Sequence, residues 1–194
     1  MARASPSDQR MILDAALAEY HAVYGLAQYR LNALDRRIPL IGGLLTAFLG
    51  SVPVLPEPTQ LLALIAVPIS LIWLVRTTIN HARSFEDALR RIEHQEHLIN
   101  DRIGADVMGF QRSHPSKGST VGGRTGRESV IAVMIAAGSL LMVCWVMSTQ
   151  VISDPRMTGG MSLMYAGIAM MLIRPFLGWR TYDYTAQGRP QKNK

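Results

Sequence analysis

The chain has 194 residues but only one cysteine, Cys144, and it has four long stretches without a charged side chain. A single cysteine cannot form an intramolecular disulfide, which excludes a disulfide-stapled secreted domain. The stretches 38–56, 58–75, 129–153 and 157–173 contain no Asp, Glu, Lys or Arg. A soluble helix as long as the third stretch would need a polar face. These absences together argue against a soluble globular enzyme.

The sequence also lacks the groups that chemistry inside a membrane usually requires. Ionisable residues at membrane depth mark proton and ion paths, and none falls within the four stretches, which argues against a proton-coupled pump or secondary transporter working as a monomer. All five histidines lie outside these stretches, which disfavours a transmembrane haem because its axial ligands must lie at membrane depth. No apolar segment lies near the start, so we expect no cleaved signal peptide.

What the chain does contain is enough apolar length to cross a bilayer four times. One crossing takes about 20 apolar residues, with roughly 17–25 tolerated. We therefore predict an all-α integral membrane protein, with four transmembrane helices as two hairpins and two cytoplasmic amphipathic helices. The first two spans are short, so a shallow re-entrant hairpin is an alternative for them. The predicted order is an N-terminal amphipathic helix (1–37), hairpin 1 (38–75), a second amphipathic helix (76–103), a Gly/Ser-rich cytoplasmic linker (104–128), hairpin 2 (129–173) and a basic tail (174–194).

The cations predict the orientation of these spans. Four crossings would place 19 of the 20 Lys and Arg residues on one side, the exception being Arg156. The positive-inside rule then puts both termini and the central loop in the cytoplasm. The short loops, the arginine bias and the absence of a transit-like leader favour a bacterial inner membrane.

Residues at the span ends predict contacts with lipid. The net charge is +6, and the arginines beside the spans favour anionic headgroups as partners, with no nucleic acid expected. These headgroup or topology residues are Arg36, Arg37, Arg76, Arg124, Arg127, Arg174 and Arg180. Trp73, Trp179 and Tyr182 suit an interfacial aromatic belt.

Two kinds of helix face predict protein contacts. Phe85, Leu89, Ile92, Ile99 and Ile103 form one apolar stripe, for which the stripe of the N-terminal helix is the obvious partner. Small residues let helices approach closely in lipid, where there is no hydrophobic force between them. They are Gly43 and Ala47 in the first span, Ala132, Ala136 and Ser139 in the third, and Ser162, Ala166 and Ala169 in the fourth. The pattern predicts helix packing, either within one subunit or between subunits.

Three other patterns have simpler explanations than a ligand site. The loop Gly118–Thr125 has the glycine spacing of a phosphate loop, but no strand precedes it, so a linker is favoured. His94 and His97 lie one turn apart without an obvious third ligand, which favours a solvated helix face. The methionines of the fourth span have spacings that suit Cu(I), but packing explains them better. We expect no metal, no cofactor and no catalytic residue.

Three functions can be compared on this basis. A non-catalytic membrane subunit, a scaffold or accessory part of a complex or a homo-oligomer, agrees best with the missing nucleophiles and ligand clusters. An oligomeric pore-forming or membrane-perturbing effector, lined by Ser139, Ser148 and Gln150, is the alternative. An enzyme acting on lipids would need a cluster on the cytoplasmic face, and His81, Arg83 and Glu86 offer only a crude one.

Overall fold

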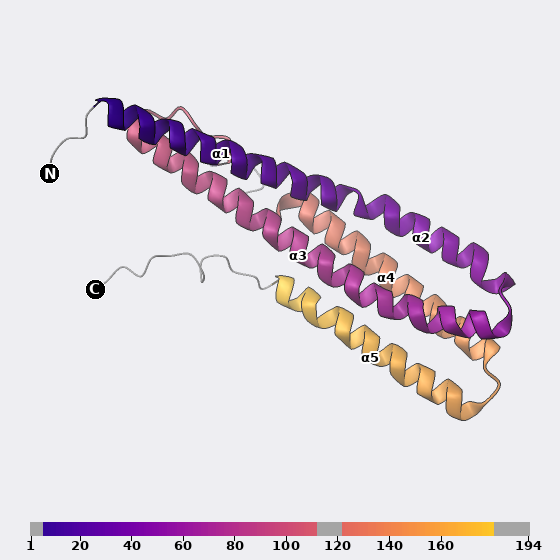
Figure 1. Cartoon of the computed structure of the whole chain (residues 1–194). Helices are drawn as coiled ribbons and strands as arrows, with labels where there is room; N and C mark the ends of the chain where they lie inside the picture. The colour runs from indigo at the N-terminus through magenta and orange to yellow at the C-terminus, as the bar shows by residue number, and fades with distance from the viewer. Residues whose placement is uncertain (1–5, 112–121, 181–194) are drawn as a thin grey trace, which may run out of the picture.

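The computed structural model describes residues 6–111 and 122–180, and all its elements are helices. They are α1 (Pro6–Asp35), α2 (Arg37–Ser51), the short 3-10 helix η1 (Val52–Val54), α3 (Glu57–Ile103), α4 (Gly123–Val151) and α5 (Pro155–Arg180). Figure 1 shows an elongated bundle in which α1 begins and α5 ends toward the same end of the molecule. The basic tail from residue 181 onward and the middle of the predicted linker, 112–121, lie outside the described residues.

Four helical segments of the described chain are long and apolar enough to cross a membrane. They are Arg10–Val54, which joins α1, α2 and η1, together with α3, α4 and most of α5. Only 17% to 39% of the most apolar window in each segment is buried inside the chain, so most of these apolar side chains are left for lipid or another protein to cover. The prediction of an all-helical protein with four membrane helices is thus confirmed at this level.

Helices α1 and α2 lie along nearly the same line and are separated by a break at Arg36, which Pro39 in the first turn of α2 explains (Figure 1). A proline has no backbone N–H, so the carbonyl of Asp35 loses its usual donor four residues later. The helix is interrupted at Arg36, and the next bond, from the Leu40 N–H to the Arg36 carbonyl, is long at 3.4 Å. The break therefore lies between α1, which carries charged residues, and the uncharged apolar segment that begins at Ile38.

The length of α3 defines the shape of the molecule. Its 47 residues extend for about 70 Å at 1.5 Å each, whereas the hydrocarbon core of a bilayer is about 30 Å thick. More than half of α3 therefore continues beyond the thickness of one crossing. This far part, residues 79–103, lies alongside α1, and we call the pair the stalk (Figure 1).

An apolar seam joins the two helices of the stalk. Val23, Ala27 and Leu34 of α1 are buried, and so are Ile79 and Ile92 of α3. The α1 residues recur at helical spacing, which places them on one face. An ion pair of 2.7 Å between Arg91 and Glu19 crosses the outer surface of the seam, but both side chains are largely exposed. Exposed pairs contribute little, so burial of the apolar seam is the main force holding the stalk together.

Helix α4 packs against α1, α2, α3 and α5. Its buried side recurs every three or four residues, through Val130, Val133, Ala137, Leu140, Cys144 and Ser148. In the bundle, α2 makes its main contacts with α4, whereas α5 contacts both α3 and α4. Helix α4 therefore contacts each of the other α-helices described.

Pro68 leaves one carbonyl of α3 without a helical donor, and α5 supplies the replacement. Because Pro68 has no N–H, the carbonyl of Leu64 has no donor from its own helix four residues on. The hydroxyl of Tyr165 in α5 donates to this carbonyl at 3.0 Å. Leu64 is fully buried and Tyr165 is 4% exposed, so the bond lies in the interior. It ties α5 to α3 at the one carbonyl that the proline leaves open.

Candidate functional site

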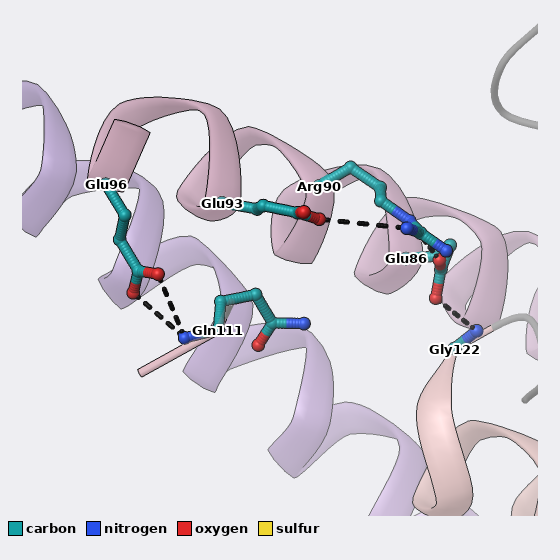
Figure 2. Close-up of polar contacts among 6 residues, drawn as sticks. All are labelled: Glu86, Arg90, Glu93, Glu96, Gln111 and Gly122. Atoms are coloured by element: carbon teal, nitrogen blue, oxygen red, sulfur yellow. Dashed lines mark hydrogen bonds and ion pairs between the residues drawn. The ribbon is translucent and has the colours of Figure 1, made fainter. Parts of the chain in front are cut away.

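The connection between α3 and α4 is attached to α3 by buried carboxylates, shown in Figure 2. Glu86 is 7% exposed, and one of its oxygens accepts a hydrogen bond of 2.7 Å from Arg90 Nε. Its other oxygen accepts from the backbone N–H of Gly122 at 3.0 Å. A buried carboxylate needs such charged and polar partners to offset its lost hydration. Glu86 therefore fixes the start of α4 against the stalk.

Glu96 holds the other end of the connection in the same way. It is fully buried, and its two oxygens share the backbone N–H of Gln111 at 3.0 and 3.1 Å (Figure 2). Tyr20 of α1 lies beside it: burial, the charge of Glu96, the neighbouring Tyr24 and a side-chain hydrogen bond with Glu96 raise the pKa of Tyr20. Glu96 thus joins α1, α3 and the segment after α3 in one polar contact.

Asn100 shapes the turn between the end of α3 and Gln111. Its side-chain oxygen accepts from the N–H groups of Val107 and Met108, and its amide donates to Asp106 and to the Met108 carbonyl. Gly104 ends α3 in the left-handed region, with φ of 72°, where glycine carries no steric cost. The first part of the predicted linker is therefore a structured turn.

Two glycines let α4 begin directly against α3. Gly122 and Gly123 have φ of 79° and 62°. A Cβ at Gly122 would lie only 3.0 Å from the carbonyl oxygen of Ala82, so a larger residue would clash with backbone. These glycines belong to the loop that has phosphate-loop spacing, and packing explains their positions. Helix α4 begins at Gly123 rather than at Ser129, because the helix continues beyond its apolar part.

An apolar groove of about 430 Å³ lies where α1, α3 and the start of α4 meet. Its lining comes from α1 (Tyr24, Ala27, Gln28, Leu31), α3 (Phe85, Leu89, Ile92), the turn (Phe110, Gln111) and the start of α4 (Gly122, Gly123, Arg124, Thr125). Arg124 is exposed and hydrogen-bonds Glu128 at 2.9 Å, and this bond raises the pKa of Arg124. Most of its described lining is apolar, so the groove suits contact with an apolar group.

The predicted stripe of α3 is largely used within the chain. Phe85, Ile92 and Ile99 are 8%, 0% and 1% exposed, and α1 is the helix packed most extensively on α3. Leu89 is half-buried and lines the groove, and Ile103 is 47% exposed at the end of the helix. Only these two residues of the stripe are therefore accessible to another molecule.

The predicted small residues lie toward the outside of the bundle. Gly43, Ala47, Ser139 and Ala166 are exposed, and Ala132, Ala136, Ser162 and Ala169 are half-buried. A Cβ added at Gly43 would meet no atom within 4 Å, so no helix in the described chain approaches it closely. Ser162 accepts a hydrogen bond of 3.1 Å from Trp145 Nε1, which links α5 to α4.

The predicted boundary residues fall into distinct environments. Arg36, Arg76, Arg127 and Arg174 are exposed, whereas Arg37 is half-buried and donates to the hydroxyls of Thr77 and Thr78. Trp73 is 70% exposed. Trp179 is only 4% exposed, because its ring packs on Phe176 and is turned into the protein rather than toward lipid. The side chain of Arg180 and all of Tyr182 lie outside the described residues.

The sequence analysis missed Glu96, Asn100 and Tyr165. The signal for Glu96 was present, because it lies one turn from both Ile92 and Ile99 on the apolar stripe. A carboxylate at such a position must find partners when the stripe is buried. In the described ranges, no group of three or more His, Cys, Asp or Glu side chains is placed to hold a metal ion.

No protein-family model matches this chain, and comparisons with curated proteins and with solved structures return no match.

Proposed function

We propose that this protein is a non-catalytic four-span membrane protein that acts as a scaffold or accessory subunit of a membrane complex, either a homo-oligomer or an assembly with other membrane subunits. Its contacts would be made through the small-residue faces of its spans and through the cytoplasmic stalk. The observation that carries this proposal is the outward position of Gly43 and Ala47 on α2.

The open surface at these residues supports an intermolecular contact. Close helix approach in lipid depends on small residues, because dispersion and weak backbone contacts replace the hydrophobic force. Gly43 and Ala47 are four residues apart on α2 and both are exposed, and no helix of the described chain covers Gly43, so this face is open to a helix of another molecule. Gly50 is exposed as well and extends this face by a further turn.

The proposed orientation puts the stalk, the start of α4 and the end of α5 in the cytoplasm, with two hairpins spanning a bacterial inner membrane. Support comes from the cation distribution, since the exposed Arg36, Arg76, Arg127 and Arg174 each lie beside the end of an apolar segment that this orientation puts on the cytoplasmic side. Reporter fusions placed after Glu57 and after Asp154 should report from the opposite side to the tail. A cytoplasmic signal from either fusion would overturn this orientation.

The assembly is tested with Gly43→Ile combined with Ala47→Ile in the full-length protein. Native mass spectrometry after mild detergent extraction should find the wild-type chain in an assembly heavier than its own 21.4 kDa. The double variant should run as a single chain with unchanged helix content, because the added atoms at Gly43 meet open space. A wild-type protein that extracts as a monomer would refute the proposal.

Ala66→Ile provides the matched control. Ala66 is exposed on the apolar part of α3, so the change adds, outside the α2 face, the same side-chain atoms that Ala47→Ile adds on it. The control should retain the assembly. If it dissociates the assembly as completely as the α2 variant does, the loss reflects added bulk rather than a specific helix contact.

The pore is the alternative function, and it makes a different prediction. Ser139 and Gln150 are exposed on α4, but Ser148 is 1% exposed and donates to the Trp145 carbonyl, which withdraws it from a lining surface. Purified protein in dye-loaded liposomes separates the two functions. A scaffold leaves the dye trapped, whereas a pore releases it in proportion to the amount of protein.

A further inference from the structure

Three basic side chains converge where the stalk meets the bundle. Arg30 near the end of α1 approaches His81 of α3, with Arg30 Nη1 lying 3.2 Å from His81 Nδ1. Arg37 at the start of α2 contacts α3 about one turn before His81. There its Nη1 donates to Thr77 Oγ1 at 2.8 Å and to Thr78 Oγ1 at 3.3 Å. The three cationic or titratable groups therefore come from three different helices.

The two arginines of the cluster form no ion pair within the part of the chain that the structure describes. Burial lowers the pKa of His81, and the positive charges of Arg37 and Arg30 lower it further. The ring is therefore held neutral beside two guanidinium groups.

One donor of the cluster lacks an acceptor. Arg30 Nε is buried and has no hydrogen-bond partner in the described structure. A buried N–H without an acceptor costs free energy, and such a group in a folded protein commonly indicates a missing water or ion. Two guanidinium groups, one of them with an open N–H, are the donors that a phosphate group requires. The Thr77 hydroxyl donates to the Leu74 carbonyl and accepts from Arg37, so its part is to position the Arg37 guanidinium.

The place of the cluster in the fold favours a lipid as the source of the phosphate. Arg37 immediately precedes the apolar segment of α2, and Thr77 follows the apolar segment of α3. Both therefore lie at the depth of the headgroups when these segments cross the membrane. Exposed apolar side chains continue from the cluster toward the bilayer: Trp73 is one turn below Thr77, and Ile38 and Leu40 follow Arg37.

We propose that Arg30 and Arg37, the latter positioned by Thr77, form a binding site for the phosphate group of an anionic membrane lipid. The two arginines would hold the phosphate oxygens, the acyl chains would lie along Trp73 and the start of α2, and the lipid would join α1, α2 and α3 at the base of the stalk. This site does not depend on the proposed partner contact, since it lies within one chain.

The experiment titrates the purified full-length protein in dodecyl maltoside with short-chain lipids and counts bound lipid by native mass spectrometry. Dioctanoyl phosphatidylglycerol should bind with a stoichiometry of one tight site, and dioctanoyl phosphatidylcholine should bind more weakly because it carries no net charge. Arg30→Gln with Arg37→Gln should weaken phosphatidylglycerol binding by roughly tenfold or more, as expected when charged hydrogen bonds are lost. Inorganic phosphate in the same titration should not displace the lipid at equal concentration.

Arg36→Gln with Arg76→Gln is the matched control. It removes the same charge from exposed positions beside the cluster. This control should retain the tight site, and an equal loss in both double variants would overturn the proposal in favour of general surface charge. Displacement by inorganic phosphate would overturn the assignment to a lipid.

Thr77→Val tests the site when the arginine variant does not fold. It keeps every charge and removes the hydroxyl that donates to the Leu74 carbonyl and holds the Arg37 guanidinium in position by accepting from it. The lipid should bind roughly three- to tenfold more weakly, the loss expected for one hydrogen bond. Unchanged affinity in this variant would refute the assigned geometry.

Discussion

Removal of one hydroxyl, in Tyr165→Phe, should destabilise the bundle because Pro68 has left the Leu64 carbonyl without another donor four residues on. The Tyr165 hydroxyl donates to this carbonyl at 3.0 Å. Phenylalanine keeps the ring and its packing, so the variant removes the bond to Leu64 together with the hydrogen bond between the hydroxyl and Ser148. Leu64 is fully buried and Tyr165 is 4% exposed, so water has little access to replace the lost donor.

The magnitude follows from two general values. An unsatisfied buried polar group costs about 1–3 kcal/mol. Side-chain hydrogen bonds measured in a membrane protein average about 0.6 kcal/mol and reach about 1.7 kcal/mol. Because the carbonyl has no helical donor at this position, we expect a loss near the upper membrane value, about 1.5 kcal/mol in the free energy of unfolding.

A double-mutant cycle with Pro68→Ala makes the test specific. This substitution restores a backbone N–H that can donate to the Leu64 carbonyl, so the Tyr165 hydroxyl becomes redundant. In that background, Tyr165→Phe should cost less than about 0.5 kcal/mol, which gives a coupling of about 1 kcal/mol. The assay is reversible unfolding in mixed micelles of dodecyl maltoside and sodium dodecyl sulfate, followed by circular dichroism.

Tyr29→Phe serves as the control, because its ring is 64% exposed on α1 and removing that hydroxyl should have little effect. The reasoning fails if Tyr165→Phe destabilises the wild-type protein and the Pro68→Ala variant equally. In that case the Tyr165 hydroxyl stabilises the protein through another contact, and its bond to the Leu64 carbonyl does not account for the effect.

Three further predictions concern the stalk and its junction with α4. Gly122→Ala should destabilise the fold by about 1–3 kcal/mol, because its φ is 79° and the new Cβ would meet the Ala82 carbonyl. Gly138→Ala, which has open space around it, should not destabilise the fold. Thermal unfolding measures both variants. Glu96→Gln should cost about 1–2 kcal/mol and speed hydrogen exchange at the Gln111 amide, and unchanged exchange there would contradict the attachment. The pKa of His81 is lowered by burial and by two arginines, so the unfolded chain takes up a proton near pH 6.5 while the folded chain does so only at lower pH. Stability should therefore fall as the pH drops through that value, and His81→Gln should remove this part of the pH dependence.

Particular residues illustrate how far the sequence could predict the fold. Pro39 and Pro68 act through the missing N–H, a property of one residue, so the helix break and the freed carbonyl follow from local chemistry. The donor that satisfies the carbonyl freed by Pro68 is Tyr165, which is far away in the sequence, and no local pattern connects the two. The apolar stripe of α3 predicted a covering helix, and α1 packs there, but the stripe did not reveal how little of it would remain accessible.

The distribution of apolar and charged residues along the sequence determined that this chain is helical and has four segments able to cross a bilayer. The length and apolarity of a helix decide whether it is stable in lipid rather than in water. The tertiary structure decided which polar groups meet. Glu86 and Glu96 are ordinary surface residues by composition, and they become buried attachment points only because α4 and the turn pack back on α3. Arg30, Arg37 and His81 are separated along the chain and come together only when three helices meet at the same level. Hydrogen bonds and ion pairs act over a few ångströms, so helix packing determines their partners. The preference of a segment for lipid is the sum of the contributions of its residues, so it can be predicted from the sequence.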